Sequence, residues 1–213
     1  MSSLLSSLVA ALLLVNLVAL GSSRIATIVR AVAAQGVLLG VLVVAAHREV
    51  SWPILGLAAA SILLKGWLIP VILLRALRQV AIKREVEPSL GLLPSLLLGA
   101  FATVAAVAAS SALPFAETRL APLLVPASLA TVAAGFILLT TRRKAISQVL
   151  GYLLLENGIF IFGLLLVRAM PFLVEAGVLL DLFVGIFVLS IIIHHIHREF
   201  ASLDTRRLAL LKD

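Results

Sequence analysis

Seven apolar runs, each long enough to cross a lipid bilayer, occupy most of this 213-residue chain. A transmembrane helix needs about 20 apolar residues, because it rises 1.5 Å per residue through ~30 Å of hydrocarbon. Leu, Ala and Val fill the runs without the alternation of a barrel strand, so each run is predicted to be a helix. The fold class is therefore an all-α integral membrane protein with about seven transmembrane helices. The predicted spans are residues 4–21, 25–46, 53–74, 90–110, 120–140, 146–167 and 174–196.

The distribution of Lys and Arg predicts the orientation of these spans. The start MSSLLSSLV has no positive charge, so the first run is predicted to be a retained helix and not a signal peptide. With the N-terminus outside and the C-terminus in the cytoplasm, the outer loops hold Arg48, Arg119 and Arg168, and most of the other cations lie inside. The inner set is Arg24, Arg30, Arg75, Arg78, Lys83, Arg84, Arg142, Arg143, Lys144, Arg198, Arg206, Arg207 and Lys212. The net charge of +7 then reflects loops that face anionic lipid headgroups, and it requires no nucleic-acid partner.

The longest inner connection, residues 75–89, divides the chain into two predicted parts. Residues 1–86 form an N-terminal three-helix membrane segment, and residues 87–213 form a C-terminal four-helix segment with a short cytoplasmic tail. Pro70 lies within the third run, where a proline frees a carbonyl of the preceding turn and kinks a helix.

The sequence offers no cofactor site. It has no cysteine, which excludes Fe–S clusters, thiolate zinc sites and disulfides within the chain. His194, His195 and His197 cluster at the inner end of the last run, and we interpret them as a wet, basic helix end and not a metal site. No phosphate loop, nucleotide fingerprint or nucleophile motif occurs, so the chain is predicted to be non-catalytic on its own.

Three ionisable residues, Lys65, Glu156 and Asp181, lie inside the runs. At 1.5 Å per residue, Glu156 is about 15 Å from the inner side, while Lys65 and Asp181 are about 18 Å and 10 Å from the outer side. The three side chains are therefore predicted to lie near one level. Each costs ~2.5–3.5 kcal/mol at the centre of a membrane helix, so they are expected to face protein or water and not lipid.

Polar and small residues accompany these groups at helical spacing. Gln148, Tyr152 and Glu156 recur at i, i+4 and i+8 and so share one face of the sixth run. The other companions are Gly177 and Gly185 around Asp181, Ser61 four residues before Lys65, Gln35 with Gly36 and Gly40 on the second run, and Asn16 on the first.

Two interpretations of the buried charges remain open. Burial and an opposite charge act on a pKa in opposite directions, so grouped charges can exchange protons, and the predicted proton path comprises Glu156, Asp181, Lys65, Tyr152 and Gln148. Alternatively, Lys65 forms an inert ion pair with Glu156 or Asp181 that only fixes helix packing.

The stretch GYLLLENGIFIFGLLL, preceded by TRRKAISQVL and followed by EAGVLLDLFVGIFVLSIIIHHIHRE, resembles the last three helices of hydrogenase-4 component E. The stretch LLKGWLIPVILLRAL is similar to the lysine and proline pattern in the third helix of that family. Residues 118–198 are also similar to the K (4L) subunit of respiratory complex I and to the C subunit of multi-subunit antiporters. In the K subunit, the second intramembrane acid corresponds to Asp181 in DLFVG, and the first corresponds to Leu153. Glu156 follows one turn later, and it either replaces that acid or makes a different contact.

The resemblance implies a non-catalytic membrane-arm subunit of a complex I-related hydrogenase, of the hydrogenase-4 or formate hydrogenlyase type, in a prokaryotic cytoplasmic membrane. It implies proton translocation coupled to electron transfer, with the nickel-iron site and Fe–S clusters in partner subunits. The implied partners are antiporter-like membrane subunits, a quinone-site-like membrane subunit, hydrogenase arm subunits and lipids. Three alternatives remain, which are a structural linker between antiporter-like subunits and the redox arm, a subunit of a cation/proton antiporter, and a freestanding small transporter.

Overall fold

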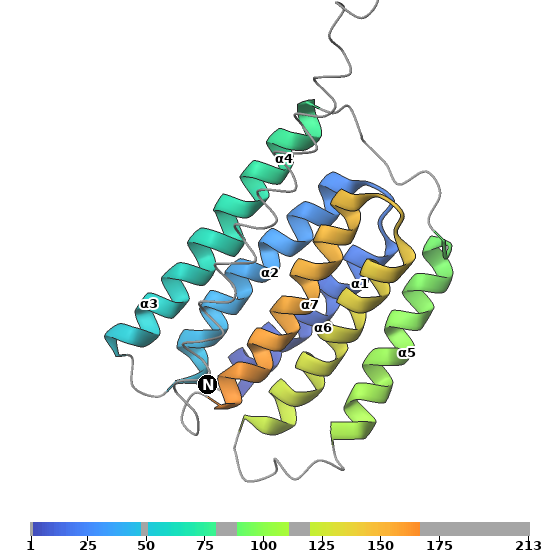
Figure 1. Ribbon diagram of the computed structural model, residues 1–213. Coiled ribbons are helices and arrows are strands. Elements are labelled where there is room, and N and C mark those ends of the chain that lie inside the picture. The colour runs from blue at the N-terminus through green and yellow to red at the C-terminus, as the bar shows by residue number, and fades with distance from the viewer. Residues whose placement is uncertain (1, 48–50, 80–88, 111–119, 167–213) are drawn as a thin grey trace, which may run out of the picture.

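The computed structural model describes residues 2–47, 51–79, 89–110 and 120–166, and their secondary structure is helical (Figure 1). Six of its helices are long and apolar enough to cross a membrane, which makes the chain a multi-pass all-α membrane protein. The elements are α1 (Ser2–Gly21), α2 (Ile25–Ala46), α3 (Trp52–Ala60), the π-helix η1 (Ser61–Leu68), α4 (Ile69–Gln79), α5 (Leu92–Ser110), α6 (Ala121–Thr141) and α7 (Ala145–Leu166).

The observed spans agree with the first six predicted spans to within two residues at nearly every end. The second span, Ile25–Ala46, was predicted without error, and α3, η1 and α4 together supply the third, Ile54–Arg75. This agreement follows because the length of an apolar run must match the thickness of the hydrocarbon layer. The seventh predicted span, residues 174–196, lies outside the part of the chain that the structure describes.

The helices form a bundle with two exposed edges (Figure 1). Helix α2 packs against α1, α7 and the α3–η1–α4 span, whereas α6 packs against α1, α5 and α7. The α3–η1–α4 span and α5 are the least buried spans, and they lie at opposite edges of the bundle. Helices from both predicted segments, 1–86 and 87–213, thus pack together, and the division of the chain between them stays a prediction.

Positive charge gathers at one end of the bundle. The α1–α2 turn, the C-terminal end of α4 and the α6–α7 turn all lie at the same end in Figure 1. In the described ranges this end carries every Lys and Arg except Lys65: Arg24, Arg30, Arg75, Arg78, Arg142, Arg143 and Lys144. The sidedness agrees with the predicted separation of inner from outer loops, and the assignment of this end to the cytoplasm stays a prediction.

Two buried apolar clusters are separated by buried polar side chains at mid-bundle. On α2, one cluster ends at Val32 and the other begins at Leu39, and Gln35 lies between them. The same order holds on the other buried spans, so the polar residues form one layer across the bundle. We call this the polar layer, and it consists of Asn16, Gln35, Ser61, Lys65, Thr131, Glu156 and Asn157.

The π-helical turn at Ser61–Leu68 precedes Pro70. Its i→i+5 hydrogen bonding is seen at the end of the segment, where the Ile69 amide donates to the Leu64 carbonyl. Pro70 has no amide hydrogen, and its ring clashes with the carbonyl of the preceding turn in a regular α-helix, so a wider turn before it relieves this conflict. The sequence predicted an irregularity at this proline, and the structure shows that it takes the form of a π-helix.

Candidate functional site

An ion pair between two spans lies in the polar layer. Lys65 Nζ is 3.6 Å from Glu156 Oε1, and both residues are buried, with exposed fractions of 7% and 9%. The Lys65 ammonium also lies over the Phe160 ring, 5.2 Å from its centroid. Helix α7 therefore presents a carboxylate and an aromatic face to one cation, and the two residues are one turn apart. This pairing confirms that Lys65 and Glu156 lie at one level, as their predicted depths required.

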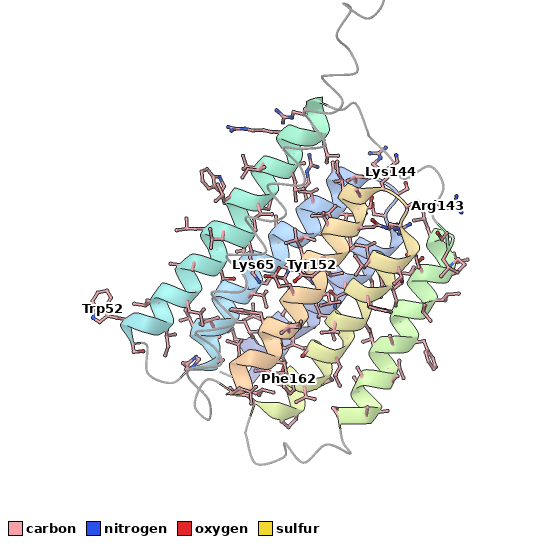
Figure 2. The ribbon with its side chains drawn as sticks, in the orientation of Figure 1. Trp52, Lys65, Arg143, Lys144, Tyr152 and Phe162 are labelled. Atoms are coloured by element: carbon pink, nitrogen blue, oxygen red, sulfur yellow. The ribbon has the colours of Figure 1, made fainter. Side chains whose placement is uncertain are left out.

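Close contact between η1 and α2 positions Lys65. A Cβ atom on Gly36 would lie 2.6 Å from both the Lys65 carbonyl carbon and the Gly66 amide nitrogen, so only glycine permits this approach. Ser61 Oγ, one turn before Lys65, donates to the Gly36 carbonyl at 3.1 Å. These contacts fix the Lys65 backbone against α2, and Figure 2 shows its side chain near the centre of the bundle.

Close packing against α6 holds α7, the helix that carries Glu156. A Cβ atom on Gly135 of α6 would clash with the Leu155 backbone, and one on Gly151 of α7 would clash with the Leu139 backbone. At Gly158 the obstacle is Val132 of α6. Small residues thus bring the two helices into backbone contact along their length, which gives the carboxylate a rigid support.

A continuous chain of hydrogen bonds joins four helices beside the ion pair. Asn157 Nδ2 on α7 donates to Gln35 Oε1 on α2 at 3.2 Å, and Gln35 Nε2 donates to Asn16 Oδ1 on α1 at 2.6 Å. Asn16 Nδ2 then donates to Thr131 Oγ1 on α6 at 2.9 Å. The Thr131 hydroxyl donates to the Ala127 carbonyl of its own helix at 2.7 Å, where the series ends. We call Asn157, Gln35, Asn16 and Thr131 the amide chain.

The remaining predicted path residues lie at different places. Tyr152 is half-buried on α7, one turn from Glu156, and Figure 2 shows it in the central part of the bundle. Gln148 is exposed near the end of α7, where its Nε2 donates to the Arg142 carbonyl at 3.1 Å. Exposure therefore falls along this stripe from Gln148 through Tyr152 to Glu156. Asp181 lies outside the described residues.

Arg142 is a buried cation that sequence reasoning placed among the loop charges. The expectation that it faces lipid headgroups is wrong, because only 1% of its surface is exposed. Its Nη2 donates to the Leu20 carbonyl at 2.8 Å, in the last turn of α1, and Arg142 itself follows the last residue of α6. At these two helix C-termini the guanidinium gives the Leu20 carbonyl a hydrogen-bond donor, and its positive charge interacts favourably with the negative end of each helix dipole.

The sequence held signals for some of the residues that were missed. Asn157 stands beside Glu156 in an apolar run, and a polar residue in such a run calls for a partner. Thr131 gave no such signal, because a threonine in a membrane helix can bond its own backbone. Arg142 gave none either, because its partner is the Leu20 carbonyl in the last turn of α1, which comes from a distant part of the sequence.

In the described ranges, no group of three or more His, Cys, Asp and Glu side chains is placed to hold a metal ion. The predicted wet helix end with His194, His195 and His197 lies outside those ranges. The polar layer contains the Lys65–Glu156 ion pair and a series of hydrogen-bonded amide and hydroxyl side chains.

Six apolar spans around a buried ion pair define a multi-pass membrane protein with ionisable groups in its core. The sequence is 31% identical over 188 residues to an uncharacterized protein of Mycobacterium tuberculosis, covering 87% of this chain and 86% of that protein. It is 30% identical over 157 residues to hydrogenase-4 component E of Escherichia coli K12, covering 73% of this chain and 72% of that protein, and the Shigella flexneri component E matches equally. The chain belongs to the hydrogenase-4 component E family. No protein-family model and no solved structure matches it.

Proposed function

We propose that this chain is a non-catalytic membrane-arm subunit of a complex I-related hydrogenase, in which buried charges contribute to proton translocation coupled to electron transfer. The observation that carries the proposal is the Lys65–Glu156 pair at mid-bundle, because ionisable groups inside a membrane protein are costly to bury and commonly mark ion pathways. Membership in the component E family supports the assignment to a hydrogenase-type complex.

The proposed path follows one face of α7. Water reaches Gln148 at the bundle end, the Tyr152 hydroxyl lies one turn deeper, and Glu156 lies one turn deeper again, about 12 Å from Gln148 at 1.5 Å per residue. Glu156 and Lys65 then exchange the proton, since both can change charge, and Asp181 receives or supplies it on the far side of the pair. Glu156 replaces the family acid that corresponds to Leu153, because one helical turn keeps nearly the same face.

The proposal extends to location and partners. The chain lies in a prokaryotic cytoplasmic membrane beside antiporter-like subunits and a quinone-site-like subunit, and its cationic end faces the cytoplasm and the hydrogenase arm. The nickel-iron site and the Fe–S clusters are in partner subunits and not in this chain, since a chain without cysteine has no thiolates to ligate them.

The test measures electron transfer and proton movement separately in membrane vesicles that contain the whole complex. Glu156→Gln keeps the shape of the side chain and removes its charge, so the complex assembles and transfers electrons while proton translocation falls by roughly a hundredfold. Thr103→Val on α5 is the control, because the Thr103 hydroxyl bonds only the Gly99 carbonyl of its own helix in the described residues. Full translocation by both Glu156→Gln and Asp181→Asn would leave these acids with a packing role.

A structural linker is the second candidate, and the amide chain favours it, because hydrogen bonds that join four helices stiffen a bundle. In this case Lys65→Met retains full proton translocation in every complex that assembles. Co-purification with the partner subunits, compared with translocation per complex, separates the two candidates.

A further inference from the structure

We infer that Gln35 and Asn157 are positioning residues that hold Lys65 and Glu156 opposite one another, with α2 as the shared reference. The inference rests on the proposed function only for the transport readout. The geometry itself concerns two neighbouring residues of α2. Gln35 fixes α7, which carries Glu156, and Gly36 fixes η1, which carries Lys65.

The side chain of Gln35 holds α7. Asn157 is the residue after Glu156, and its Nδ2 donates to Gln35 Oε1 at 3.2 Å. Adjacent residues of a helix point about 100° apart, so a bond at Asn157 sets the rotation of α7 about its axis and thereby the direction of the Glu156 side chain. A rotation of α7 that turns Glu156 away from Lys65 must break this bond.

The backbone of Gly36 holds η1. Its carbonyl accepts from Ser61 Oγ at 3.1 Å, and its missing side chain lets the Lys65 backbone lie directly against α2. Ser61 and Lys65 are one turn apart on η1, so this contact sets the height and rotation of the lysine. Because Gln35 and Gly36 are consecutive, the acid and the base are both positioned from one point of α2.

The glycine contacts hold α7 against α6, but apolar packing alone does not provide the register of α7 relative to α2. The clusters on either side of the polar layer consist mainly of Leu, Val, Ile and Ala, and such interfaces permit sliding and alternative packings. A buried amide pair specifies one register, because any shift leaves polar groups without partners in a medium that has no water. The carboxamide bond thus supplies the specificity that the aliphatic contacts lack.

The amide chain is suited to positioning and not to conduction. None of Asn157, Gln35, Asn16 and Thr131 titrates, and their donors point successively away from Glu156 until the Thr131 hydroxyl reaches the Ala127 carbonyl. Among the described residues this route ends at a backbone carbonyl and includes no ionisable group beyond Glu156, so it gives a proton on Glu156 no titratable acceptor.

The test uses the absence of cysteine from the chain, which allows spin labels at two chosen positions. Leu63→Cys on η1 and Ile159→Cys on α7 place labels at side chains that are 59% and 57% exposed and are not members of the polar layer. The distance between the labels in the full chain, reconstituted in lipid nanodiscs, reports the relative position of the two helices. Substitutions of Gln35 and Asn157, made in the labelled chain, are also made in the whole complex, where proton translocation is measured.

The matched variants shorten the side chain at position 35 by one methylene group, lengthen the side chain at position 157 by one, or do both. Gln35→Asn is too short to reach Asn157, and Asn157→Gln alone is too long, so each single variant is expected to broaden or shift the label distance and to move the pH profile of translocation. The double variant Q35N/N157Q restores the combined length of the 35–157 pair but not the reach of residue 35 to Asn16, so it is expected to recover both readouts in part. Thr103→Val, which removes a hydroxyl bonded within α5, is expected to change neither.

Unchanged label distances in both single variants overturn the inference. So does a double variant whose label distance is no closer to the parent distance than that of Gln35→Asn, because both proteins lack the bond to Asn16 and only the double variant can restore the bond between positions 35 and 157. The proposed function fails separately. If Glu156→Gln transports protons normally while the distances follow the amide length, Gln35 and Asn157 position a pair that is structural only.

Discussion

Lys65 and Arg142 are both buried cations, and they differ in what they face. Lys65 lies at mid-bundle against a carboxylate and an aromatic ring from α7. Arg142 lies at the end of the bundle, where its guanidinium donates to a backbone carbonyl of α1 at the end of α6. Similar burial therefore serves two different settings, one between ionisable side chains and the other between helix ends.

The chemistry of the two cations matches these settings. A lysine gives up its proton readily when its surroundings change, and its carboxylate partner can accept one. A guanidinium stays charged, and a peptide carbonyl does not titrate, so the Arg142 contact is permanent at any pH near neutral. For this reason the proposed function assigns proton exchange to the Lys65–Glu156 pair and a structural role to Arg142.

The largest expected effect comes from breaking the pair at Lys65. Lys65→Met leaves Glu156 as a buried charge without its ammonium partner, which costs roughly 3–5 kcal/mol in the free energy of unfolding. The double variant K65M/E156Q removes both charges and is expected to recover most of that loss. Unfolding in mixed micelles measures the stability of the parent protein, Lys65→Met and the double variant. Equal stability of the single and double variants would contradict a direct pairing.

A smaller loss of stability is expected at Arg142. Arg142→Leu removes the hydrogen bond to the Leu20 carbonyl and costs about 1.5–3 kcal/mol, the usual value for a bond that involves a charged group. Arg142→Lys keeps the charge but loses the forked donors of the guanidinium, so its stability is expected to lie between those of the parent protein and Arg142→Leu. Translocation per assembled complex stays normal in both variants.

The difference between the two cations would disappear if Arg142→Lys assembled normally but failed to translocate protons. Arg142 would then belong to the ion path, and its place at the helix ends would not explain its burial.

Close packing behind Lys65 gives the next effect. Gly36→Ala introduces a Cβ atom 2.6 Å from backbone atoms of η1, which separates the two helices and costs about 1–2 kcal/mol. Gly56→Ala is the matched control, because a Cβ atom there meets nothing within 4 Å. Thermal unfolding compares them, and equal melting temperatures would show that η1 does not depend on this contact.

The smallest effect is expected from the aromatic face. Phe160→Leu retains an apolar side chain and removes the ring over the Lys65 ammonium, for a loss of about 0.5–2 kcal/mol. Phe136→Leu on α6 serves as the control, because that ring is mostly exposed. Comparable losses at both positions would mean that the ring contributes packing and no specific attraction to the cation.

The fold was largely predictable because a membrane imposes a length on each helix. Six apolar runs matched the observed spans, and the rise per residue alone placed Lys65 and Glu156 at one depth, which their 3.6 Å contact confirms. Helix propensity was not needed for this result, since the bilayer admits few alternatives.

The site was predictable only in part, because it depends on which helices are neighbours. Sequence reasoning left Lys65 free to pair with either acid, and the arrangement around α2 selects Glu156 among the described residues. It also grouped Gln148 with Tyr152 and Glu156 on one polar face, and the structure shows that the Gln148 side chain donates to the Arg142 carbonyl in the α6–α7 turn. The bond between Arg142 and Leu20 joins residues that are 122 positions apart, and the bond between Asn16 and Thr131 joins residues that are 115 positions apart. No local sequence pattern predicts such contacts.

The amide chain also sets a timetable for membrane insertion. Asn16 and Gln35 are 19 residues apart, so the α1–α2 hairpin can satisfy this bond as soon as it leaves the ribosome exit tunnel. Gln35 must then wait for Asn157, 122 residues later, which takes roughly 6 to 24 seconds at usual elongation rates. During that interval the side chain of Gln35 lacks its partner on α7, and the amide chain is complete only after α7 is translated.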